Sequence, residues 1–308
     1  VTFSGDQNVG LTGTGAQLTG VTVVDSSTAT STVTLSVTAA ANDLSDVAAD
    51  SIVVSDLNAT ADTVTLAATG ANLSLAAATT AADVLQLVSN AAASTATDSV
   101  TVIGTGATTV IGNGSAGNGT GTDTFQAVNY SSSLATGANT LTATLGANAT
   151  TGATLDISGS VAVTLAAGAT AISVNGANMT GVLTADTTNA ATVSGGSAAD
   201  VLTADTADTT INGNGGADDL NVTGAIDGVT VNGGDGNDDI DLNAAIQTDA
   251  IINAGAGNDT LDLAGAATGN DVDMGTGNDA VVLVASVTGD FDGGLGTDSI
   301  DLAGASAT

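Results

Sequence analysis

The chain has 308 residues with 32 acidic side chains and no Lys, Arg or His, giving a net charge of −32. All of the acids are Asp, and Cys is absent as well. This composition excludes nucleic-acid binding and docking on anionic lipid, because both need basic side chains. It also leaves Asp as the only candidate for a general base, so we expect no enzyme activity.

The apolar part of the chain predicts an all-β protein with a thin core. Hydrophobic residues make up 43 % of the sequence, yet aromatic residues contribute only 1 % and Pro is absent. Val, Ile and Thr recur throughout, and β-branched side chains favour strands. No apolar run of about 18 residues exists, so we expect no membrane-spanning helix.

Residues 1–192 form the first predicted region, an acid-poor and degenerate β-solenoid or other β-rich structure. A D-x-Φ-x-Φ pattern, where Φ is apolar, recurs at Asp62, Asp83, Asp98 and Asp123. Between residues 139 and 185, strand-like "TLTATL" and "VAVTL" alternate with glycine- and alanine-rich turns. Two Ala-rich stretches, 38–50 and 80–93, are alternatively short helices with Thr at the N-cap.

Residues 193–308 contain a repeat with a period near 20 residues. Twelve-residue units beginning at 193, 211, 231, 252, 272 and 291 superpose without gaps, as in "VNGGDGNDDIDL" from Val231. Each unit reads apolar residue, polar residue, glycine-rich turn, Asp, then a strand of period two. Such a repeat is typical of a parallel β-solenoid in which each coil stacks on the last, so Val231, Ile240 and Leu242 should point inward.

The eighth position of every unit is Asp, which indicates a shared role. Equivalent residues of stacked coils are ~4.8 Å apart, where two carboxylates repel by roughly 3.5 kcal/mol at an effective dielectric of ~20. Since no basic side chain is present, we expect a cation between them, and an all-oxygen ligand set favours Ca²⁺. In a single copy, glycine and Asp would indicate only a tight turn, but six aligned copies favour a site.

The stretches "GGDGNDDID" and "GGLGTDSID" resemble the nonapeptide G-G-x-G-x-D-x-U-x of the RTX family of secreted proteins. This resemblance covers about a hundred residues and implies a calcium-binding parallel β-roll, with one file of several ions along the glycine turns. It also implies export from a bacterium, with folding deferred until the chain meets extracellular calcium.

The predicted calcium ligands are the repeated carboxylates and the turn glycines, whose left-handed backbone would direct carbonyls at the ion. They are Asp200, Asp218, Asp235, Asp238, Asp259, Asp279, Asp298, Gly213, Gly215, Gly233, Gly234, Gly236, Gly255, Gly257, Gly275, Gly277, Gly293, Gly294 and Gly296.

These observations predict a secreted structural subunit of a calcium-stabilised bacterial surface layer or extracellular filament. Its expected partners are further copies of itself, with a cell-surface glycan as another candidate, and no nucleic acid. Two alternatives stay open. The chain could be a spacer in a large adhesin, or an ice-binding solenoid, although its turn positions lack the regular outward residue that ice binding needs.

Overall fold

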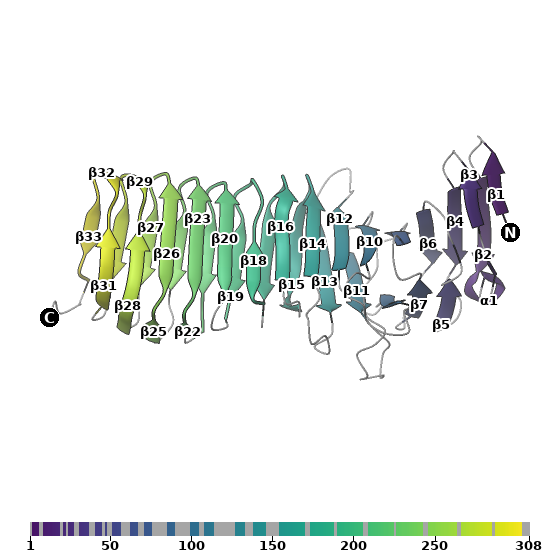
Figure 1. Cartoon of the computed structure of the whole chain (residues 1–308), viewed down its shortest axis with the longest axis horizontal. Coiled ribbons are helices and arrows are strands. Elements are labelled where there is room, and N and C mark those ends of the chain that lie inside the picture. The colour runs from purple at the N-terminus through teal and green to yellow at the C-terminus, as the bar shows by residue number, and fades with distance from the viewer. Residues whose placement is uncertain are drawn as a thin grey trace. The chain divides into compact units, whose positions relative to one another are not determined.

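The computed structural model divides into two compact units, residues 1–171 and 172–308 (Figure 1). It describes residues 2–5, 9–18, 21–22, 24–27, 31–36, 41–44, 47, 51–56, 62–66, 71–75, 85–89, 99–104, 108–113, 127–132, 138–145, 154–169, 173–187, 190–205, 209–224, 226–242, 246–263, 266–284 and 287–303.

The first unit is built from two parallel sheets between which the chain alternates. One sheet contains β2 (Val9–Thr14), β4 (Ser31–Ser36), β6 (Ser51–Asp56), β8 (Ala71–Leu75), β10 (Ser99–Gly104), β12 (Ala127–Ser132) and β14 (Thr154–Gly159). The other contains β5 (Ala41–Leu44), β7 (Asp62–Leu66), β9 (Leu85–Ser89), β11 (Thr108–Asn113), β13 (Ala138–Leu145) and β15 (Ala162–Ala169). A separate parallel pair joins β1 (Thr2–Gly5) and β3 (Val24–Ser27), and a single turn of helix, α1 (Gly15–Leu18), packs on β2 and β5.

The second unit repeats the same winding more regularly. One sheet contains β16 (Ser173–Met179), β18 (Thr192–Ser194), β20 (Thr210–Gly215), β23 (Thr230–Asp235), β26 (Ile251–Ala256), β28 (Ala266–Asp273) and β31 (Val287–Asp292). The other contains β17 (Leu183–Thr187), β19 (Val201–Ala204), β21 (Asp219–Val222), β24 (Asp239–Leu242), β27 (Thr260–Leu263), β30 (Ala280–Leu283) and β33 (Ser299–Asp301). The turns add short parallel pairings of β22 (Ile226–Asp227) with β25 (Ile246–Thr248) and of β29 (Thr276–Gly277) with β32 (Leu295–Gly296).

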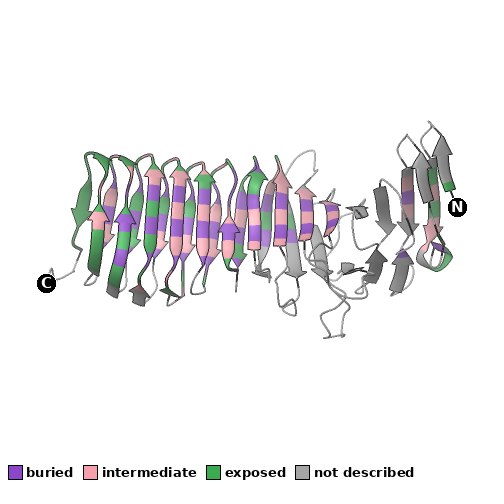
Figure 2. Cartoon of the chain, viewed as in Figure 1, coloured by how far each residue is buried: buried purple, intermediate pink, exposed green. Residues whose placement is uncertain are grey.

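The register between coils follows the sequence repeat, which confirms the predicted parallel β-solenoid. Val231 of β23 pairs with Ile252 of β26, and Ile240 of β24 pairs with Leu261 of β27. These four side chains and Leu242 are completely buried, as the period-two pattern predicts. Figure 2 shows this alternation as stripes of buried and more exposed residues along the strands of the second unit. The core between these coils of the second unit is therefore a narrow stack of aliphatic side chains.

The described parts of the two Ala-rich stretches are strands, so the helical alternative is wrong there. Residues 41–44 form β5 and residues 85–89 form β9. Both strands pair in register with β7, and this ladder overrides the modest helix preference of Ala and Leu. The remaining residues of those stretches lie mostly outside the described ranges. The compact units divide at 171/172, whereas the sequence division at 192/193 marks the start of the glycine-rich repeats.

Candidate metal centre

The repeated aspartates point into the solenoid. Asp238 lies two and four residues before the buried Ile240 and Leu242, and alternation along a strand places all three on the same face. Asp238 is accordingly 2 % exposed. The other repeated aspartates except Asp298 are buried in the same way. We call the six of them the aspartate ladder: Asp200, Asp218, Asp238, Asp259, Asp279 and Asp298.

One oxygen of each ladder carboxylate is held by the backbone of the preceding coil. The amide N–H of Asp218 donates to Oδ1 of Asp238 at 2.9 Å, and that of Asp238 donates to Oδ1 of Asp259 at 2.8 Å. The same bond runs from Asp200 to Asp218, from Asp259 to Asp279 and from Asp279 to Asp298, at 2.7, 2.8 and 3.0 Å. Sequence reasoning missed these bonds, which compensate part of the buried negative charge.

The second carboxylate oxygen is different in four of the coils. Oδ2 of Asp218, Asp238, Asp259 and Asp279 is buried and has no hydrogen-bond partner. In Asp200 the corresponding Oδ2 accepts the amide N–H of Gly196 at 2.6 Å. Buried polar atoms without a partner are uncommon and costly, so the row of four Oδ2 atoms requires an explanation.

Three of the predicted ligand glycines make room for the Oδ2 atom of a ladder aspartate, and two of these atoms belong to the row without a partner. A Cβ added at Gly213, Gly233 or Gly293 would collide with Oδ2 of the aspartate in the same turn. The equivalent inward position holds Ala254 and Met274 in two later coils, and both are buried. The carboxylates of those two coils therefore have different surroundings from those of Asp218 and Asp238.

Eight further predicted glycines adopt the left-handed backbone that the sequence indicated. Gly236 has a φ of +143°, and a Cβ there would overlap the carbonyl oxygen of Gly216 in the preceding coil. Gly215 is an exception, because its φ is not in this region and a Cβ would meet nothing closer than 3.9 Å. The eight are Gly234, Gly236, Gly255, Gly257, Gly275, Gly277, Gly294 and Gly296.

A second file of side chains joins the coils in the opposite direction. Oδ1 of Asn237 accepts the amide N–H of Asn258 at 2.8 Å, and Oδ1 of Asn258 accepts that of Asn278 at 2.7 Å. Thr297 donates in the same way to Asn278 at 2.9 Å. Asn occupies the seventh position of three repeat units, and this regularity could have predicted the second file from the sequence.

Burial raises the pKa values of four aspartates of the ladder. Burial raises the pKa of Asp218 to about 7, against a backbone hydrogen bond that lowers it, and the charges of Asp238 and Asp200 raise it further. Burial raises the pKa of Asp259 to about 6 by the same balance of causes. The pKa values of Asp200 and Asp238 are also raised, mainly by burial.

The ladder fits a hard cation in its donor type, although carboxylates alone do not complete a site. Within the described ranges, no group of three or more acidic side chains lies close enough to hold a metal ion. Asp235, another predicted ligand, is exposed. Burial is the main cause that raises the pKa of Asp238, and the negative charge of Asp235 raises this pKa further. An ion on Oδ2 would therefore need backbone carbonyls or water as its other ligands.

Comparison of the chain with protein-family models, curated proteins and solved structures gives no match. In the part of the chain that the structure describes, no helix is long and apolar enough to cross a membrane.

Proposed function

We propose that this chain is a structural subunit of a calcium-stabilised extracellular assembly, either a bacterial surface layer or a filament. The row of buried Oδ2 atoms without a partner, in a chain that has no basic side chain, carries this proposal. The RTX-like repeats support calcium as the ion and secretion as the route, and copies of the chain itself are the proposed partners.

Comparison with Asn side chains of the solenoid indicates that the ladder carboxylates have a role besides accepting backbone N–H groups. Asn270, on the opposite side of the coil, is 1 % exposed and accepts the amide N–H of Ala250 at 3.2 Å through Oδ1. Asn237 and Asn258 cap amides in the glycine turns as well. An amide can therefore cap a buried N–H without carrying a charge, but Nδ2 of Asn270 is then itself buried without a hydrogen-bond partner. Repetition of Asp at the eighth position therefore favours a role for the charge, and binding a cation is such a role.

Calcium would supply charge compensation to Oδ2 and a bridge between neighbouring coils. With a Kd of ~10⁻³ to 10⁻⁴ M, as in extracellular modules, 1 mM calcium contributes only about 0.4–1.4 kcal/mol per site. Several ladder sites acting together are then needed for a large increase in stability. Stacked repeats behave in this way, because each coil is stabilised by its neighbours.

Calcium titration of the full chain tests the proposal. We expect β structure, followed by circular dichroism, to increase cooperatively with calcium in the millimolar range, and EDTA to leave a less stable fold with a lower melting temperature. Magnesium at the same concentration should be much less effective, since it requires a stricter octahedral geometry. A spectrum and melting temperature that are unchanged by EDTA would contradict the proposal.

The residues at one position of the glycine-rich turn do not favour the ice-binding alternative. Gly215, Asp235 and Ala256 occupy equivalent places in successive coils, and Thr276 and Leu295 continue the same file. This file therefore does not present one residue type regularly. The adhesin-spacer alternative predicts the same calcium response but no self-association, so the assembly experiment described in the Discussion separates it from our proposal.

A further inference from the structure

Strands β20 and β23 contain Asn–Gly sequences, in which Asn is prone to deamidation. The backbone nitrogen of the glycine attacks Cγ of Asn, a C–N bond forms, and ammonia leaves with the proton of that nitrogen. Water then opens the cyclic imide to Asp or isoaspartate. Glycine favours ring closure because it has no side chain. The sequences are Asn212–Gly213, Asn214–Gly215 and Asn232–Gly233. Asn175–Gly176 of β16 is not among them, because Oδ1 of Asn175 accepts the N–H of Ala177 in its own strand at 3.1 Å.

The aspartate ladder requires two of these glycines. Gly213 and Gly233 are buried, and a Cβ at either would collide with Oδ2 of the ladder aspartate in the same turn. The residue before each glycine faces outward and is Asn. In the next coil the equivalent pair is Asn253 and Ala254, so the same outward Asn is there followed by a residue with a side chain. The packing of the ladder therefore creates the labile sequence in β20 and β23, and Asn253 provides a natural comparison.

Hydrogen bonds between coils hold the amide groups of this outward file. Nδ2 of Asn212 donates to Oγ of Ser194 at 3.0 Å. Nδ2 of Asn232 donates to Oδ1 of Asn212 at 2.8 Å, and Nδ2 of Asn253 donates to Oδ1 of Asn232 at 2.8 Å. Ring closure requires the Asn side chain to turn back toward the following N–H, which breaks these bonds. The amides of Asn212 and Asn232 are thus fixed through both nitrogen and oxygen.

In Asn214–Gly215 the preceding coil holds both reacting groups. Nδ2 of Asn214 donates to the carbonyl oxygen of Gly195 at 2.8 Å, and the N–H of Gly215 donates to the carbonyl oxygen of Gly196 at 3.2 Å. Asn214 is exposed, so water can reach it. Hydrogen bonds between coils, and not burial, therefore oppose its deamidation.

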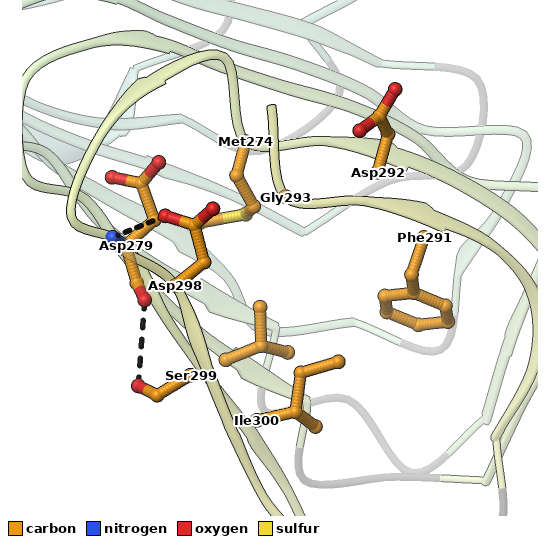
Figure 3. Close-up of a pocket in the computed structure, with 9 residues that line it drawn as sticks. Met274, Asp279, Phe291, Asp292, Gly293, Asp298, Ser299 and Ile300 are labelled. Atoms are coloured by element: carbon orange, nitrogen blue, oxygen red, sulfur yellow. Dashed lines mark hydrogen bonds between the residues drawn. The ribbon is translucent and has the colours of Figure 1, made fainter. Parts of the chain in front are cut away.

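Later coils show how a carboxylate behaves in the same file. Asp273 follows Asn253 in register, and its Oδ1 accepts the N–H of Gly275 in its own turn at 3.0 Å. Asp292 makes the same type of bond, and Figure 3 shows its carboxylate apart from the other carboxylates in view. Conversion of Asn232 to Asp would remove the Nδ2 donor that binds the preceding coil. Isoaspartate would also lengthen the backbone of a strand that has to stay in register. Either product would weaken stacking.

We propose that Asn212, Asn214 and Asn232 are latent deamidation sites that the stacking of coils keeps unreactive. When neighbouring coils separate, the amides are released, ammonia is lost and the product no longer restacks as before. A reversible opening thereby becomes irreversible. The population of the opened state sets the rate of conversion. This inference goes beyond the proposed assembly and does not depend on calcium binding.

Deamidation of the folded and the unfolded chain provides the test. The full chain is kept at mildly alkaline pH, in one sample folded, as judged by circular dichroism, and in the other unfolded in urea. Peptic peptides are then analysed by mass spectrometry for the mass increase that accompanies loss of the amide. In urea we expect Asn212, Asn214 and Asn232 to convert readily, and Asn253, which precedes Ala254, to convert much more slowly. In the folded chain the three sites should react at least about tenfold more slowly than in urea.

A matched pair of variants links the protection to a named bond. Ser194→Ala removes the acceptor of Nδ2 of Asn212, so it should speed deamidation of Asn212 in the folded chain by about threefold to tenfold and leave Asn232 unchanged. Thr192→Ala, at the other outward position of β18, should change neither rate.

Three results would overturn the inference. They are equal rates in the folded chain and in urea, no conversion of the three sites in urea, and a Ser194→Ala variant in which Asn212 reacts no faster than Asn232. The last result would show that the bond between coils does not protect Asn212. None of them would bear on the calcium proposal, because folded and unfolded samples are compared without reference to the ion.

Discussion

At the scale of single residues, the two oxygens of each ladder carboxylate have different environments. Oδ1 is fixed by an amide of the neighbouring coil, so the side chain cannot turn toward solvent without losing that bond. Oδ2 remains buried without a donor in four coils. A buried carboxylate in this position is stabilised either by a proton or by a cation, and the two compete for the same oxygen.

This competition predicts opposite pH dependence with and without calcium. In EDTA, the folded-state pKa values of Asp218 and Asp259, about 7 and about 6, lie above the unfolded value of ~3.9. The folded chain then binds more protons between pH 4 and 7, so its melting temperature should rise as the pH falls from 8 to 5. In saturating calcium it should fall over the same range, because protons displace the ion. Parallel melting curves in the two buffers would refute cation binding at the ladder.

Asp238→Asn separates the charge of the ladder from its hydrogen bond. The amide retains an acceptor for the N–H of Asp218, so in EDTA at pH 7.5 we expect no loss of melting temperature. In millimolar calcium the variant should lose roughly 1 kcal/mol or more of calcium-dependent stabilisation, the contribution of about one site. Asp186→Asn is the matched control, because Asp186 is exposed on β17 and should change neither value appreciably. Equal effects of both substitutions in calcium would indicate bulk charge instead of a site.

At the scale of strands and turns, the sequence predicted the parts whose pattern is local. The period-two strands of residues 239–242 and 260–263 and the left-handed glycines at 236 and 257 are present in the structure. Asp238 lies two residues before Ile240, so strand alternation already implied that its side chain points inward, but the sequence analysis did not make this prediction. The bonds between coils were not predictable, because they depend on which atoms of residues about 20 positions apart meet after stacking.

Glycine substitutions test how these turns hold the coils together. Gly236→Ala places a Cβ onto the carbonyl oxygen of Gly216 and requires a φ of +143°, so we expect a loss of at least about 2 kcal/mol in the free energy of unfolding. Gly215→Ala, which brings its Cβ no closer than 3.9 Å to a neighbour and needs no positive φ, should stay within about 0.5 kcal/mol or stabilise slightly. Urea unfolding in millimolar calcium measures both. Similar losses for the two variants would show that the turn geometry described here is wrong.

At the scale of the whole molecule, the outer surface of the second unit opposes association unless cations are present. Asp219 and Asp239 are partners on neighbouring strands, as are Asp241 and Asp262. Strand spacing places each pair of Cα atoms about 4.8 Å apart, and the chain offers no basic side chain to a neighbouring copy. Copies of the chain can therefore associate through this face only if divalent ions bridge their carboxylates. Without such ions, repulsion keeps the copies apart.

We therefore expect assembly to require more calcium than folding does. Light scattering by the purified chain should increase at a calcium concentration above the midpoint of the circular dichroism transition, and electron microscopy should then show sheets or fibres. Replacing the exposed Asp239 and Asp262 together by Asn should raise the calcium needed for scattering without moving the folding midpoint, because neither residue belongs to the buried ladder. The pair Asp186→Asn and Asp301→Asn removes the same charge from other outward positions of that sheet and controls for net charge. A calcium-folded chain that stays monomeric at high concentration would refute self-assembly and favour the adhesin spacer, since a spacer needs the calcium-stabilised solenoid but no contact between copies.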